Sequence, residues 1–206
     1  ALCVPVHIEN DANAAALAER ISGVARHLDS FAYLYFGAGL GLGIVAHGRL
    51  LKGAFGNAGE IGAIRVPSPA GGVVLEDAVS RIAVQHHLAK AGIVANSGAE
   101  LAHLYATQSP PLLDWLDKAN APLAHAVSVV ENLFDPQAVI LGGAMPDAML
   151  DHLIAHVVPA CPSVSFRQDR SAPRLMKGAS GRMTATLGAA ALVLHQTFTP
   201  HIAIAS

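Results

Sequence analysis

The segment FAYLYFGAGLGLGIVAHG, residues 31–48, combines two apolar runs with a series of alternating glycines. Phe31 to Phe36 and Gly43 to Ala46 are rich in residues that favour strands, and we expect two strands joined by a glycine loop. A His-Gly pair then predicts a turn into a further strand at Arg49 to Leu51. The segment is therefore typical of a hairpin or meander. Its glycines interrupt the apolar run, which falls short of the roughly 18 residues that a membrane helix needs.

Strand-to-helix junctions lie on both sides of this segment. Val4 to Ile8 alternate apolar and polar residues, and good helix formers follow from Ala12 to Leu28 with Asp11 placed as the N-cap. A buried strand at Ala138 to Leu141 leads through two glycines into a helix from Asp147 to Val158. Strand, turn and helix in this order are typical of the α/β class. Further strands are expected at 61–66 and 174–176, a linker at 71–72, and helices at 76–91, 112–116, 120–134 and 184–198.

Composition excludes several classes of protein. With 206 residues, of which 52% are hydrophobic and 14% charged, the chain is neither a disordered tail nor a solvated coiled coil. The net charge is −2 and the basic residues do not cluster, which argues against a nucleic-acid groove in this segment. Two distant cysteines, Cys3 and Cys161, favour a reduced, cytoplasmic protein. The chain has no visible signal peptide and does not begin with Met, and we interpret it as part of a longer protein.

Acidic and amide side chains gather at the first strand-to-helix junction, in Glu9-Asn10-Asp11-Ala12-Asn13. A carboxylate at a helix N-terminus is stabilised as the anion and can accept a proton from a substrate hydroxyl. The alternative is that Asp11 only caps the helix. Eleven histidines form no metal-binding motif, and we expect no metal site.

Three glycine-rich stretches carry the other candidates. Gly37, Gly39 and Gly41 leave backbone amides free to face an anion such as a phosphate, or simply form a tight turn. Glu60 lies within a glycine-rich loop that would let a polar ligand approach, or is a solvated acid. Glu76 stands at a predicted helix N-terminus, where it would complement the helix dipole.

In combination, the motif at 9–16, the glycine turn at 37–43 and the loop at 53–62 resemble the ROK family in order and spacing. The resemblance extends from about Val4 to Phe198. It implies an actin-like ATPase (ribonuclease H-like) fold, and residues 1–206 would form mainly its second subdomain, the C-terminal sugar or effector-binding domain. The first subdomain, and any helix-turn-helix, would precede residue 1.

The resemblance also implies roles for single residues. In the family's kinases, the aspartate that matches Asp11 is the base that deprotonates the sugar hydroxyl. The residues that match Asn10, Glu60 and Glu76 bind the sugar. Gly37, Gly39 and Gly41 match the phosphate loop, and Gly142 and Gly143 match the turn beside the nucleotide.

Departures from the family pattern favour a regulator over a kinase. The usual loop threonine is Ala38, the usual histidine after Glu-Ile-Gly is Ala63, and a cysteine-free segment at 67–75 replaces the family's zinc segment. We therefore expect a sugar-responsive transcriptional regulator of the repressor type, a homodimer or homotetramer that binds DNA through another domain, with no zinc. Its sugar would be an effector.

The alternative is an ATP-dependent hexose kinase with Asp11 as base and with ATP and Mg²⁺ as substrate and cofactor. A third possibility is a scaffold that binds neither sugar nor nucleotide.

Overall fold

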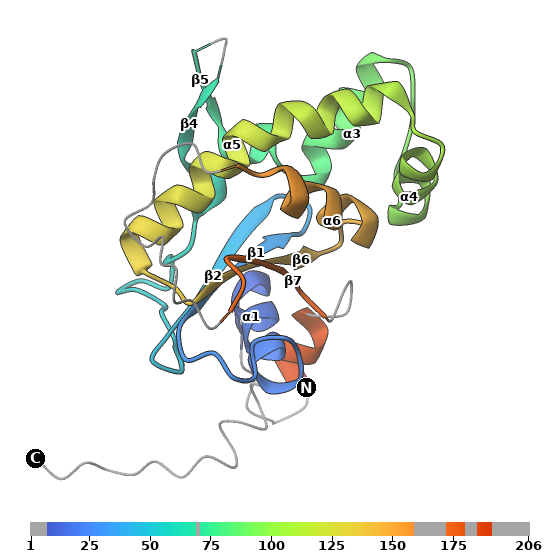
Figure 1. Cartoon of the computed structure of the whole chain (residues 1–206). Helices are drawn as coiled ribbons and strands as arrows, with labels where there is room; N and C mark the ends of the chain where they lie inside the picture. Colours follow the sequence, from blue (N-terminus) through green and yellow to red (C-terminus); the bar gives the residue numbers. More distant parts are fainter. Residues whose placement is uncertain (1–7, 69–70, 159–171, 180–184, 191–206) are drawn as a thin grey trace, which may run out of the picture.

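A five-stranded mixed sheet forms the centre of the structure (Figure 1). In this computed structural model, residues 8–68, 71–158, 172–179 and 185–190 are described. The strand order is β3-β2-β1-β6-β7, in which β1, β2 and β3 form an antiparallel meander and β6 and β7 run parallel to β1. The strands are β1 (Phe31–Phe36), β2 (Leu40–Ala46), β3 (Arg49–Leu50), β6 (Ala138–Gly143) and β7 (Leu175–Lys177). The α/β class and the predicted meander are confirmed.

Helices cover both faces of this sheet (Figure 1). The alternating side chains of β1 divide between two cores, so that Leu34 and Phe36 join one and Phe31 and Tyr33 join the other. Helix α1 (Asp11–Ser22) lies on the second face, and Ala185, at the start of the helical residues 185–190, packs against the same core. The helices on the first face are α2 (Leu75–Ala78), α3 (Arg81–Lys90), α4 (Gly98–Ala106), α5 (Pro110–Phe134) and α6 (Asp147–His156).

Glycines in β2 let α1 approach the sheet closely. A Cβ built on Gly43 would lie 2.4 Å from the carbonyl oxygen of Ala12 and 2.8 Å from the Cβ of Ala16. A Cβ on Gly41 would lie 2.9 Å from the Cβ of Ala12. Alanines on the helix and glycines on the strand therefore place the N-terminus of α1 directly against the sheet.

The expected break between helices at 116–120 is wrong, because α5 runs without interruption through Pro122. Proline removes one backbone hydrogen bond and its ring crowds the preceding turn. Pro122 is buried, and so are Leu116 and Leu123 on either side of it, so the apolar face of the helix continues across the proline. The stop at Asp135 is confirmed, since that residue adopts the left-handed conformation with φ 41°.

Other boundaries also differ from the sequence-based expectation. Residues 61–66 begin as a 3-10 helix, η1 (Ile61–Ala63), and only then enter β4 (Arg65–Ser68). The expected linker is instead β5 (Gly71–Val74), which pairs with β4 in a separate two-stranded sheet where Pro67 is tolerated. The predicted helix at 76–91 is divided into α2 and α3, because the side chain of Ser80 accepts a hydrogen bond from Ala83 N and starts a new helix.

The two ends of the chain lie mainly outside the described residues. Of the predicted strand at 4–8, only Ile8 is described, and it is not in a strand. Of the predicted helix at 184–198, residues 185–190 are described and are helical. Across the described ranges, every helix is too short or too polar to cross a membrane.

Candidate functional site

Asn10, and not Asp11 as expected, caps helix α1. Its Oδ1 accepts hydrogen bonds from the backbone N–H groups of Ala12 (2.9 Å) and Asn13 (3.3 Å). Asp11 is the first residue of the helix, and its Oδ1 shares the Ala12 N–H at 2.9 Å. Its Oδ2 faces the glycine turn, 3.4 Å from the position of a Cβ built on Gly37. The cap thus leaves the amide nitrogen of Asn10 and one oxygen of Asp11 available to a ligand.

The second carboxylate of the site is that of Glu76, which reaches the same turn from helix α2. Its Oε2 lies 2.7 Å from a Cβ built on Gly39 and 3.2 Å from one built on Gly62. The carboxylate can occupy this position because neither glycine has a side chain. The turn between β1 and β2 is therefore bordered by Asp11 on one side and Glu76 on the other.

Glu60 ends a loop whose backbone requires glycine. Gly53, Gly56 and Gly59 have φ values of 72°, 81° and 99°, a region that other residues rarely adopt. Gly59 lies against β2, where its carbonyl accepts a hydrogen bond from Leu42 N at 3.1 Å. Glu60 is exposed and is followed by η1, which carries the exposed Ala63. The loop thus delivers a solvent-accessible carboxylate next to the segment that contacts Glu76.

Two of the glycines expected to bind phosphate have packing roles. Gly41 lies within β2 against Ala12 and not in the turn, which contains Gly37 and Gly39. A Cβ on Gly142 would come within 2.1 Å of Tyr33 Oη, so this glycine makes room for a buried ring. Gly143 has φ 114° and lines a cavity. Of the expected phosphate and nucleotide glycines, Gly37 and Gly39 lie in the turn between β1 and β2, and Gly143 lies at the end of β6, where a Cβ would be 2.7 Å from the carbonyl oxygen of Phe36.

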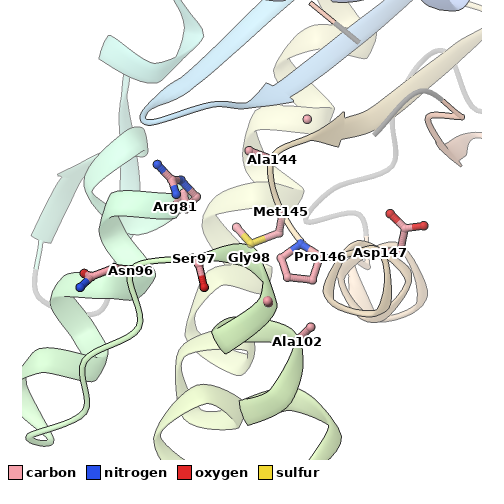
Figure 2. Close-up of a pocket in the computed structure, with 11 residues that line it drawn as sticks. Arg81, Asn96, Ser97, Gly98, Ala102, Ala144, Met145, Pro146 and Asp147 are labelled. Carbon is pink, nitrogen blue, oxygen red and sulfur yellow. The ribbon is translucent and has the colours of Figure 1, made fainter. Parts of the chain in front are cut away.

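A cavity of about 480 Å³ lies at the C-terminal end of β6, between α3, α4 and α6 (Figure 2). The N-termini of α4 and α6 both border it, and the N-cap of α6 is Pro146, which supplies no side-chain cap. In the described chain the Nε of Arg81 is buried without a hydrogen-bond partner at this cavity. Free helix N–H groups and an unpaired guanidinium nitrogen suit an anionic group.

Sequence reasoning missed two residues that interact with the acidic motif at 9–13. Tyr35 is 9% exposed, and burial together with the charge of Asp11 raises the pKa of its hydroxyl. Lys52 forms an ion pair with Glu9, 43 residues away. No local pattern marks such a pair, because the two residues meet only after the meander has folded. Among the described residues, no three His, Cys, Asp or Glu side chains group as a metal site would require.

The sequence matches the model of the ROK family over residues 1–196. Over 155 residues it is 36% identical to the bifunctional enzyme NanE/NanK of Brucella suis biovar 1 (strain 1330), a match that covers 74% of this chain and 29% of that protein. The match therefore spans less than a third of the length of this relative.

Solved structures of two kinds share the fold. The ROK hexokinase from Thermus thermophilus superposes with a TM-score of 0.71 at 29% identity, covering 94% of this chain and 66% of the other. A ROK family transcriptional regulator, a homologue of the E. coli MLC protein, superposes with a TM-score of 0.70 at 25% identity, covering 92% and 52%. The sheet described above is thus that of the actin-like ATPase fold. Both its sequence and its architecture place this chain in the ROK family.

Proposed function

We propose that this chain binds a hexose-type sugar between Asn10, Asp11, Glu60 and Glu76, and that the sugar is the effector of a transcriptional regulator. The observation that carries the sugar site is the cap of α1. Because Asn10 takes over the capping, its amide nitrogen can donate and the free oxygen of Asp11 can accept. Glu76 and the exposed Glu60 add further acceptors for sugar hydroxyl groups.

Two alanines support the regulatory role over a catalytic one. Ala38, at the tip of the β1–β2 turn, offers no hydroxyl to a phosphate, and its carbonyl oxygen accepts a hydrogen bond from Ile82 N at 3.3 Å. Ala63 offers no imidazole beside Glu60. The solved relatives include a ROK regulator of similar fold. A sugar with different affinities for two conformations of the whole protein would shift their populations and so change DNA binding through another domain.

The test is calorimetric titration of the full-length protein with glucose, N-acetylglucosamine, N-acetylmannosamine and xylose, each with and without ATP and Mg²⁺. We expect one sugar to bind, no phosphorylated sugar to form, and the same sugar to change the affinity of the protein for its own promoter DNA. Asp11→Asn should weaken sugar binding by about tenfold, which corresponds to one hydrogen bond to a charged group. Lys118→Met, on the exposed surface of α5, is the matched control and should bind normally.

A kinase is the second candidate, and two observations favour it. Asp11 Oδ2 lies beside Gly37. A base at this position could take the proton from a sugar hydroxyl that attacks a phosphate held by the glycine turn. The cavity at Gly143 has the free helix N–H groups and the Arg81 nitrogen that would suit the phosphates of a nucleotide. If ATP-dependent sugar phosphorylation is found and Asp11→Asn lowers it by 10²-fold or more, the kinase reading replaces the regulatory one.

A further inference from the structure

The carboxylate of Glu9 binds three partners from two separate parts of the chain. Its Oε2 lies 2.5 Å from Lys52 Nζ, and its Oε1 accepts hydrogen bonds from Asn13 Nδ2 (3.1 Å) and from the backbone N–H of Asn10 (3.2 Å). The side chain of Glu9 is only 8% exposed, whereas that of Lys52 is 50% exposed. One carboxylate oxygen of Glu9 thus binds the turn that starts α1, and the other binds a lysine that is distant in the sequence.

Lys52 stands at the base of the loop that carries Glu60. Its carbonyl oxygen accepts a hydrogen bond from Ala58 N at 3.1 Å, which closes the turn at residues 53–57. At the tip of that turn, Phe55 is 91% exposed and a Cβ on Gly56 would meet no atom within 4 Å. The tip therefore contributes little to holding the loop in place. The loop is held at its two ends, by Lys52 at its base and by the hydrogen bond from Leu42 N to the carbonyl oxygen of Gly59 beside Glu60.

The two parts joined in this way are the two parts of the sugar site. Asn10 and Asp11 directly follow Glu9, and Glu60 follows Lys52 through the loop. A ligand that contacts both parts gains affinity when they are held in place before it arrives, because less conformational entropy is lost on binding.

We propose that the Glu9–Lys52 pair is a latch that positions the Glu60 loop against the N-terminus of α1 and thereby sets the affinity of the site for its sugar. Glu9 and Lys52 are positioning residues in this account and need not touch the sugar. The inference rests on the proposed sugar site, but the geometry of the latch exists without a ligand.

The first experiment is a double-mutant cycle on sugar affinity in the full-length protein. Lys52→Met keeps an unbranched side chain of nearly the same length, and Glu9→Gln keeps an oxygen for Asn13 and Asn10, so each removes the ion pair with little change of shape. We expect either change to weaken binding by about five- to tenfold, which corresponds to the free energy of ordering one or two side chains when the sugar binds. The double variant should bind no more weakly than the single variants, because both changes remove the same ion pair. Lys52→Arg should bind almost normally, and Lys118→Met is the control. Unchanged affinity in Lys52→Met would overturn the latch.

Salt separates the latch from a general loss of folding. The sugars in the panel are neutral, so any effect of salt on their affinity must come from charges within the protein. Raising NaCl from 50 mM to 500 mM should weaken binding to the wild type and leave Lys52→Met unaffected, because an exposed ammonium group is screened. An equal salt dependence in both proteins would contradict the proposal.

Hydrogen exchange tests the latch in the absence of any sugar. Residues 53–60 should exchange faster in Lys52→Met than in the wild type or Lys118→Met, while α5 exchanges equally in all three. If the wild type binds no sugar but the loop is loosened as expected, the proposed function fails and the latch stands. If sugar binds and the loop exchanges equally in wild type and Lys52→Met, the latch fails and the function stands.

Discussion

Oε2 of Glu76 occupies the space in which Gly39 would carry a side chain: a Cβ built on Gly39 lies 2.7 Å from it. The glycine turn and the carboxylate of α2 are therefore complementary in shape. The turn does not need glycine at position 39 for its backbone conformation, since Gly39 does not have a positive φ. Glycine at this position instead leaves room for the carboxylate of Glu76.

Gly39→Ala should consequently push the Glu76 carboxylate away from the turn. Because Glu76 is exposed and its side chain can move, we expect the free energy of unfolding to change by less than about 0.5 kcal/mol. Sugar affinity should fall by about tenfold, as for the loss of a hydrogen bond to a charged group. Calorimetric titration and urea unfolding measure the two effects. Gly72→Ala, where the nearest atom would be 3.5 Å away, is the control.

Two substitutions of Asn10 should separate its capping role from its role toward the ligand. Asn10→Asp keeps the oxygen that caps Ala12 and Asn13 but loses the amide donor, so stability is preserved and sugar affinity falls. Asn10→Ala loses both and should also cost about 1 kcal/mol of unfolding free energy. Urea unfolding alongside titration tests this. Equal affinity in Asn10→Asp and wild type would remove Asn10 from the sugar site.

The contribution of Glu9 to stability should depend on pH. Burial tends to raise the pKa of Glu9, but hydrogen bonds from Lys52, Asn13 and Asn10 outweigh it and hold the pKa below the usual 4.5. The unfolded chain therefore binds the proton more readily, and this stabilisation is present above pH 4.5 and lost as the pH falls through the lower, folded value. Unfolding free energies from pH 6 to pH 3 should fall less in Glu9→Gln than in the wild type.

His152 should cause a second loss of stability on acidification, in a higher pH range than that of Glu9. Its Nδ1 lies 3.3 Å from Tyr105 Oη and its ring stacks on His156 with centroids 4.1 Å apart. Burial and the charge of His156 lower the pKa of His152 below 6.5, although Asp117 opposes them. Stability should therefore decrease as the pH falls from 6.5 through the folded value. His152→Phe should show a flatter stability profile between pH 7 and pH 5, and an unchanged slope would contradict the assignment.

Local patterns predicted most of the sheet, and the errors have specific causes. The apolar run of β1, the start of β6 at Ala138 and the helix stop at Asp135 all depend on neighbouring residues, and they were predicted correctly. The end of β6 differs, because the strand continues through Gly142 and Gly143, which were expected to form the turn. The helix start predicted at Pro122 and the loop position predicted for Gly41 are wrong, because the places of these residues depend on what packs against them. Pro122 on its own predicts the start of a helix, but in the structure it is buried inside α5, which continues through it. Gly41 lies in β2 and makes room for Ala12.

The sequence by itself determined the α/β class and the membership of the ROK family and supplied candidates for the site, because these reside in motifs of neighbouring residues. Only the tertiary structure decided that Asn10 is the cap, that Glu76 reaches Gly39, and that Lys52 holds Glu9 across 43 residues. Contacts between distant residues depend on the packing of α1 and the loop against β2. Spacing along the chain carries no information about which side chains that packing brings within hydrogen-bond distance.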